Sequence, residues 1–121
     1  MSSTKSLESR LEESTIEFQK LQTDLSNAVE ARQRLDSQKS ENEGVLKEFA
    51  VLKPHNTIYK MIGPSLVKQE QAEAKSNVEK RLEFINSEIV RVEKTLADLS
   101  TRSEKKKLEI VAMQQESQAQ A

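Results

Sequence analysis

The sequence predicts a mainly α fold, in which a long antiparallel two-helix coiled coil carries a β-hairpin at its turn. Two apolar ladders with heptad spacing flank the middle of the chain, and most helix-breaking residues gather between them. Pro54, Gly63 and Pro64 lie within eleven residues, and Gly44 is the only other glycine or proline. We therefore expect the chain to turn at its midpoint, and residues 1–121 to form a single unit.

The first predicted helix covers residues 5–52. Its apolar positions recur in alternating steps of four and three residues, and nine of the thirteen positions are apolar, which is typical of a coiled-coil seam. The helix should end before Pro54, because proline disfavours the α conformation of the preceding residue and lacks a backbone N–H. The thirteen positions of this first ladder are Leu7, Leu11, Ser14, Phe18, Leu21, Leu25, Ala28, Arg32, Leu35, Lys39, Asn42, Leu46 and Phe49.

The hairpin is predicted at residues 55–70, where two β-prone segments flank Gly63 and Pro64. An isolated two-stranded hairpin is marginal in water, and both of its strands are edges. We therefore expect several chains to pool their hairpins into one sheet or β-barrel platform, from which the coils project. The residues expected to make this assembly surface are Ile58, Tyr59, Met61, Ile62, Gly63, Leu66 and Val67.

The second predicted helix covers residues 71–115, and a frayed tail is expected at 116–121. Nine of its eleven ladder positions are apolar, and its length nearly equals that of the first helix, which favours a hairpin of helices over one continuous rod. Facing residues should have numbers that sum to about 123, so that Phe18 lies opposite the region of Lys106. The second ladder is Val78, Leu82, Ile85, Ile89, Val92, Leu96, Leu99, Ser103, Lys106, Ile110 and Met113.

The composition argues against several classes of function. Nineteen basic and twenty acidic residues give a net charge of −1, so no global basic field is available to hold nucleic acid or an anionic membrane. Cysteine is absent and His55 is the only histidine, which argues against a metal site or a thiol nucleophile. Gly63 stands without the further glycines of a phosphate loop, so nucleotide binding is not expected. Together, these missing groups lead us to expect neither catalytic residues nor a cofactor.

Three further features have a simple interpretation. His55 beside Pro54 is expected to be an exposed turn residue. The lysine run at 105–107 is interpreted as a solvated stripe near the end of the second helix, because Glu104 and Glu109 offset its charge. The first residues and the absence of a long apolar run predict neither secretion nor membrane insertion, which makes the cytoplasm the expected compartment.

The middle of the chain resembles the β-type subunits of the prefoldin family. The coil periodicity is nonspecific, whereas the region between residues 42 and 85 carries the distinctive pattern. The resemblance implies a heterohexamer of two α-type and four β-type subunits with a double β-barrel platform and six coiled-coil arms. It also implies that the complex holds unfolded actin and tubulin and passes them to the cytosolic chaperonin without ATP. The matching segments are 42–49 (NEGVLKEF), 59–60 (YK), 63–64 (GP), 66–69 (LVKQ) and 77–85 (NVEKRLEFI).

On this resemblance, the free ends of the two helices are the expected client-binding surface. Polar ladder residues such as Ser14, Ser103 and Lys106 should loosen the coil there, and apolar residues beside the seam exceed what two helices can bury. Unfolded chains present apolar segments of no fixed sequence, which adaptable apolar contacts can bind. The expected client-binding residues are Leu7, Leu11, Ile16, Phe18, Leu108, Ile110, Val111 and Met113.

Other classes of protein share part of this sequence pattern and remain alternatives. A scaffold or tethering coiled coil would show the same heptads, but it does not need a β-hairpin at its midpoint. A basic-zipper DNA-binding protein needs a basic block before its heptads, whereas residues 1–33 contain more acids than bases. An enzyme is the most remote alternative, because the sequence offers no thiol nucleophile, metal-ligand cluster or phosphate loop.

Overall fold

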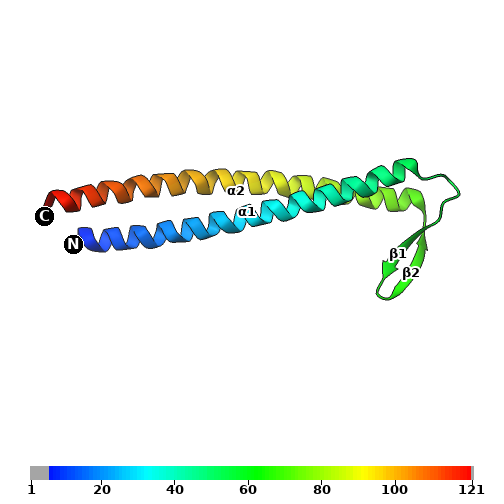
Figure 1. The fold of residues 1–121 in the computed structure, drawn as a ribbon, viewed down its shortest axis with the longest axis horizontal. Coiled ribbons are helices and arrows are strands. Elements are labelled where there is room, and N and C mark those ends of the chain that lie inside the picture. The colour runs from blue at the N-terminus through cyan, green and yellow to red at the C-terminus, as the bar shows by residue number, and fades with distance from the viewer. Residues whose placement is uncertain (1–5, 121) are drawn as a thin grey trace, which may run out of the picture. The chain divides into compact units, whose positions relative to one another are not determined.

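The computed structural model describes residues 6–120 and contains four elements in chain order (Figure 1). These are helix α1 (Leu7–Val51), strand β1 (Ile58–Ile62), strand β2 (Ser65–Gln69) and helix α2 (Gln71–Gln120). The predicted fold class, two long helices connected through an antiparallel β-hairpin, is confirmed. Within residues 6–120, no helical stretch has the length and apolar character needed to cross a bilayer.

A serine cap, a backbone hydrogen bond to Glu70 and one proline mark three of the helix ends. Ser6 caps α1, because its Oγ accepts a hydrogen bond from the backbone N–H of Ser9 at 3.1 Å. The predicted first residue, Lys5, lies outside the described residues. The backbone carbonyl of Glu70 accepts the first helical hydrogen bond of α2, from Ala74 at 3.0 Å. Helix α1 ends at Val51, three residues before Pro54.

The C-terminal end of α2 differs from the prediction. The helix was expected to end near Gln115 and to be followed by a frayed tail, but α2 continues through Gln120. Residues 116–120 are Glu, Ser, Gln, Ala and Gln, and neither glycine nor proline interrupts them, so the helix has no local reason to stop. The last residue of the expected tail, Ala121, lies outside the described residues.

The chain divides into two compact units, each of which contains part of both helices. The described part of the first unit comprises residues 6–31 and 92–120. In its core, Leu21 of α1 and Leu99 of α2 are buried, together with Ser14 and Ser103. The serines are small enough for the two helices to approach closely, so they pack into the seam rather than face water.

The second unit comprises residues 32–91 and includes the hairpin. Its core is built mainly by one face of α2, where every third or fourth residue is buried. The α1 side of this unit contributes ladder residues that are half-buried, such as Leu46 and Phe49. The buried residues of α2 in this unit are Ala74, Val78, Leu82, Ile85 and Ile89.

Both predicted ladders and their register are confirmed. All thirteen positions of the first ladder and all eleven of the second are buried or half-buried. In the first unit Glu17 pairs with Lys106, and in the second Asn42 accepts a hydrogen bond from Arg81 at 3.3 Å. The residue numbers in each of these pairs sum to 123, as expected for the antiparallel alignment.

Candidate functional site

The β-hairpin of the second unit is the first candidate site. Strands β1 and β2 pair in antiparallel register from Ile58 with Gln69 to Ile62 with Ser65. Gly63 and Pro64 form the two-residue connection, and Gly63 has a φ of 58°. A left-handed first residue followed by proline, whose φ is fixed and negative, corresponds to a type II′ turn. This turn type matches the right-handed twist of the strands, which is why the sequence folds back here.

Both faces of this hairpin are apolar and exposed. Because side chains alternate along a strand, residues that pair across the ladder share a face. Met61 and Leu66 pair directly, and 73% and 65% of their surfaces are exposed. Each face thus carries three large apolar side chains, and all of them except Ile58 are exposed in the single chain. One face carries Ile58, Ile62 and Val67, and the other carries Tyr59, Met61 and Leu66.

The structure therefore places the predicted assembly residues together on one small sheet. Gly63 forms the turn, Ile58 at the root of the hairpin is half-buried, and the other five side chains are exposed. A two-stranded sheet has unpaired backbone groups along both outer edges. Such a surface can form hydrogen bonds through its edges and bury apolar area through its faces.

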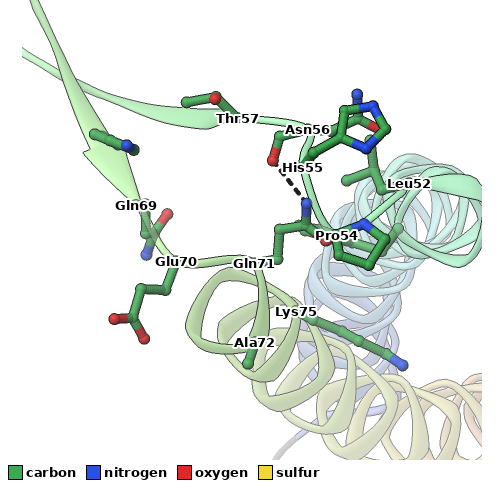
Figure 2. Close-up of a pocket in the computed structure, with 12 residues that line it drawn as sticks. Leu52, Pro54, His55, Asn56, Thr57, Gln69, Glu70, Gln71, Ala72 and Lys75 are labelled. Carbon is green, nitrogen blue, oxygen red and sulfur yellow. Dashed lines mark hydrogen bonds between the residues drawn. The ribbon is translucent and has the colours of Figure 1, made fainter.

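A compact turn and one side chain close the root of the hairpin. In the turn at residues 53–56, the backbone N–H of Asn56 donates to the carbonyl of Lys53 at 3.0 Å. The Asn56 side-chain oxygen accepts from the backbone N–H of Lys53 at 2.7 Å. The Gln71 amide donates to the carbonyls of Lys53 and Asn56 at 2.8 and 2.7 Å, and Figure 2 shows this side chain directed toward Asn56.

A cleft of about 910 Å³ lies beside this root (Figure 2). Phe49 of α1 and Leu52, just after the end of that helix, line it, together with Lys68 of β2 and Lys75 of α2. His55 also lines the cleft and is exposed, as expected for a turn residue. No group of three potential metal-ligating side chains occurs within residues 6–120.

Sequence reasoning missed the roles of Gln71 and Asn56. An asparagine two residues after a proline is a recognisable turn signal, so the Asn56 turn could have been found. Gln71 resembles the other glutamines of the chain, and no local pattern distinguishes it. Its two acceptors are fifteen and eighteen residues away in the sequence.

The eight predicted client-binding residues all lie in the first unit, but they fall into two groups. Ile16, Leu108 and Val111 point outward, with exposed fractions of 58%, 67% and 40%. The other five are half-buried and belong to the seam between the two helices. These seam residues are Leu7, Leu11, Phe18, Ile110 and Met113. The structure thus presents an outward apolar surface that is smaller than the sequence suggested.

A polar cluster interrupts the apolar seam of the first unit. Lys106 Nζ lies 2.7 Å from the carboxylate of Glu17 on the other helix and 2.9 Å from that of Glu109 on its own helix. Hydrogen bonds to Glu17 and then Glu109 raise the pKa of Lys106 above its usual value. The hydrogen bond from Lys106 also holds the pKa of Glu109 below its usual value.

This cluster corrects the interpretation of the lysine run. The run at 105–107 was expected to be a solvated stripe, but Lys106 is half-buried at the seam, whereas Lys105 and Lys107 are exposed. Three consecutive helical residues point in different directions, so they do not form one basic surface. Nearby, the side-chain amide of Gln22 donates a hydrogen bond to the hydroxyl of Ser103, which is a second polar link across the same seam.

Comparison with known proteins gives consistent results. A family profile described as "Prefoldin subunit" matches residues 4–117. Prefoldin subunit 6 of Mus musculus is 42% identical over 112 residues, which cover 93% of this chain and 88% of the mouse protein. Prefoldin subunit 6 of Saccharomyces cerevisiae is 42% identical over 96 residues, covering 79% of this chain and 84% of the yeast protein. The resemblance to the prefoldin family that the sequence predicted is thereby confirmed.

The fold also matches a solved structure. The crystal structure of the prefoldin beta subunit from Thermococcus strain KS-1 superposes with a TM-score of 0.78. The match covers 85% of this chain and 90% of that chain, at 17% sequence identity. At this level of identity the likeness supports the fold alone, namely two long helices that flank a β-hairpin.

Proposed function

Because the chain belongs to the prefoldin subunit family, we propose that it joins α-type and other β-type prefoldin subunits in a heterohexameric chaperone. In this complex the hairpins form a shared β-barrel platform. The helical ends of the first unit capture unfolded proteins of the actin and tubulin class. The complex then delivers these clients to the cytosolic chaperonin without ATP, and it acts in the cytoplasm.

The observation that carries this proposal is the exposure of both faces of the hairpin. Five large apolar side chains of β1 and β2 are exposed, and both outer strand edges lack a neighbouring strand. Burial of apolar surface contributes about 25 cal/mol per Å², so covering these faces favours association. Pairing the edges with further strands also satisfies the backbone hydrogen-bonding groups that the hairpin leaves open.

Client capture is supported by the apolar side chains that remain exposed in the first unit. Ile16 and Leu108 do not belong to the apolar ladders and lie on the exposed surface of their helices, where a stable coil usually carries polar residues. One chain offers little apolar area for binding. Several arms in one complex would raise the effective concentration of such contacts, so that weak binding at each arm adds up to a firm but reversible hold.

The assembly step can be tested with a double substitution in the hairpin. Ile62→Asp with Leu66→Asp places one charge on each face of the sheet, and burial of an unpaired charge costs several kcal/mol. We expect this variant to lose co-elution with the other subunits in gel filtration while its helical circular dichroism remains. Normal co-elution of the variant would contradict the proposed platform.

A matched control adds two charges to the same unit outside the hairpin. Ser37 and Ser40 are exposed residues of α1, so Ser37→Asp with Ser40→Asp should leave co-elution unchanged. A chain that forms a parallel homodimeric rod instead of joining other subunits would favour a scaffold or tethering coiled coil. Crosslinking between identical helix positions would detect that arrangement.

A further inference from the structure

We propose that Gln71 is a positioning residue that holds the hairpin in a defined direction relative to the helices of the second unit. This inference rests on the proposed assembly function, because a fixed direction matters only if hairpins must meet in a common platform. This role involves the root of the hairpin, whereas the proposed assembly surface is formed by its apolar faces. Gln71 lies at the root, where the chain enters β1 and leaves β2.

The two hydrogen bonds of Gln71 link parts of the chain that would otherwise move independently. Lys53 and Asn56 belong to the connection from α1 to β1, whereas Gln71 is the first residue of α2. Its amide nitrogen reaches both carbonyls, at 2.8 and 2.7 Å. Since a primary amide has two N–H donors, this arrangement uses both of them.

The bridge lies just beyond the last pair of the strand ladder. Ile58 and Gln69 form the outermost pair, and Asn56 and Gln71 are each two residues further from the turn. The hydrogen bond between Gln71 and Asn56 therefore closes the root of the hairpin, as the Gly63 turn closes its tip. It also attaches that root to the first turn of α2.

Within the two strands, only Ile58 and Gln69 at the root of the hairpin are half-buried. Residues 59–68 are all exposed, so their side chains are not packed against the helices. The turn at residues 53–56 is closed by two hydrogen bonds between Asn56 and Lys53. The hairpin can then rotate relative to the helices through the backbone of Thr57 and Glu70. The hydrogen bonds from Gln71 to Lys53 and Asn56 connect the chain on either side of these two residues.

A hairpin with a fixed direction loses less conformational freedom when it joins a multichain sheet. Preorganisation of this kind increases affinity without adding any contact to the interface. The bridge consists of two hydrogen bonds that are accessible to solvent, and each such bond contributes modestly. We therefore expect its loss to weaken assembly by roughly 3- to 10-fold, in contrast to the complete loss caused by charges on the hairpin faces.

Two substitutions separate the bridge from the stability of the helix. Gln71→Leu removes both donors and has a helix propensity close to that of glutamine. Gln71→Glu also removes both donors and directs a negative charge at two carbonyl oxygens, although a carboxylate in the first turn favours the helix. Both variants should loosen the hairpin, whereas Gln71→Glu should leave α2 at least as stable as before. Gln33→Leu, an exposed glutamine of α1 in the same unit, is the matched control.

The direction of the hairpin can be measured with spin labels on the isolated 121-residue chain. The chain contains no cysteine, so Ser65→Cys at the tip and Ser76→Cys on α2 give two unique labelling sites. Double electron–electron resonance should give a narrow distance distribution for the parent chain and for Gln33→Leu. The distribution should broaden in both Gln71 variants. An unchanged width in both would overturn the proposal.

Assembly is then measured with the same variants and unlabelled partner subunits. A dissociation constant that is 3- to 10-fold higher in both Gln71 variants supports the positioning role. An unchanged dissociation constant in variants whose spin-label distance distribution is broadened contradicts it. The label distances are obtained without any partner. A failure of the proposed assembly function can therefore be distinguished from a failure of the role assigned to Gln71.

Discussion

Lys106 of α2 lies 2.7 Å from the carboxylate of Glu17 on α1, although Lys106 occupies a seam position that a coiled coil normally fills with an apolar residue. A polar residue at such a position specifies the alignment of the helices at some cost in stability. Gln22 and Ser103 form a second polar link in the same unit. The alignment of this part of the coil therefore depends on side-chain hydrogen bonds as well as on apolar burial.

Replacing Lys106 by leucine should stabilise the first unit. The substitution Lys106→Leu places an apolar side chain in the seam, which should contribute about 1 kcal/mol, and the carboxylates of Glu17 and Glu109 that lose their partner are exposed enough to be hydrated. We expect a higher midpoint of thermal unfolding, measured by circular dichroism. Lys107→Leu, at the neighbouring exposed position, should leave the midpoint nearly unchanged. A lower midpoint for Lys106→Leu would mean that the ion pair stabilises the coil more than apolar packing does.

Acid should weaken the first unit through Glu109. The pKa of this carboxyl is lowered in the folded chain by its hydrogen bond with Lys106, so its contribution is present above the usual value of 4.5. That contribution is lost as the pH falls from 4.5 through the lowered folded value. The pKa of Lys106 is raised, so its contribution is present below 10.5 and is lost at higher pH.

This pH dependence can be measured from the thermal midpoint between pH 2 and pH 7. The variant Glu109→Gln should show a shallower decline in acid than the parent chain, because it lacks the titrating carboxyl. Glu116→Gln offers a comparison, since its partner Arg10 lies at the longer distance of 4.0 Å. Equal acid profiles for Glu109→Gln and the parent would show that the interaction with Lys106 contributes no stability.

Gly44→Ala should stabilise helix α1. A Cβ added at Gly44 meets no atom within 4 Å, and alanine exceeds glycine in helix propensity by about 0.8–1 kcal/mol. Gly63→Ala is the contrasting variant, because the φ of 58° at this residue is unfavourable for alanine. Urea unfolding should give opposite changes in stability for the two variants. A loss of stability in Gly44→Ala would imply that this position needs a glycine for another reason.

Client capture should depend on the helical ends of the first unit. Removal of residues 1–15 and 109–121 should leave the hexamer intact but raise the aggregation of a denatured client after dilution, because apolar contacts are lost. Light scattering measures this effect. If the truncated complex suppresses aggregation as well as the full one, these ends are structural and the binding surface lies elsewhere.

Point substitutions refine this test without shortening the helices. Ile16→Ser and Leu108→Ser change outward residues that are 58% and 67% exposed, so they should reduce client capture with little loss of helicity. Glu12→Ser, at an exposed acidic position of α1, provides the control. A loss of capture only after seam substitutions such as Phe18→Ser would point to a requirement for coil integrity rather than for outward contacts.

Capture and transfer of clients should proceed equally well without ATP. The chain carries no glycine-rich phosphate loop, and the proposed mechanism uses only apolar contacts and assembly. Binding of an unfolded client to the complex is measured with and without nucleotide, with the downstream chaperonin assayed separately. A nucleotide-dependent affinity of the complex for unfolded chains would contradict passive capture.

Heptad spacing was sufficient to identify the two helices and their shared seam. Every ladder position from Leu7 to Phe49 and from Val78 to Met113 is buried or half-buried. This success has a simple cause, because a helix repeats its faces every 3.5 to 3.6 residues and a coil buries one of them. Likewise, the hairpin followed from two β-prone segments on either side of Gly63, which tolerates a positive φ, and Pro64, whose φ is fixed.

The outward direction of Ile16 and the seam position of Phe18 are also consequences of this period. Phe18 lies on the predicted ladder and Ile16 lies beside it, and the structure places Phe18 in the seam and leaves Ile16 58% exposed. In the sequence, the three lysines at 105–107 are consecutive and have the same chemistry. On a helix these three lysines are rotated by about 100° from one another, and only Lys106 reaches the seam.

The partners of Gln71, Lys106 and Asn42 became evident only in the folded chain. The links from Gln71 to Asn56, from Lys106 to Glu17 and from Arg81 to Asn42 join residues that are 15, 89 and 39 positions apart in the sequence. A local pattern records which backbone conformation a residue favours, but a hydrogen-bond partner depends on where the other segment is brought by folding. Periodicity therefore reveals the elements and their buried faces, whereas the polar contacts that align the helices and close the hairpin root arise from the three-dimensional arrangement.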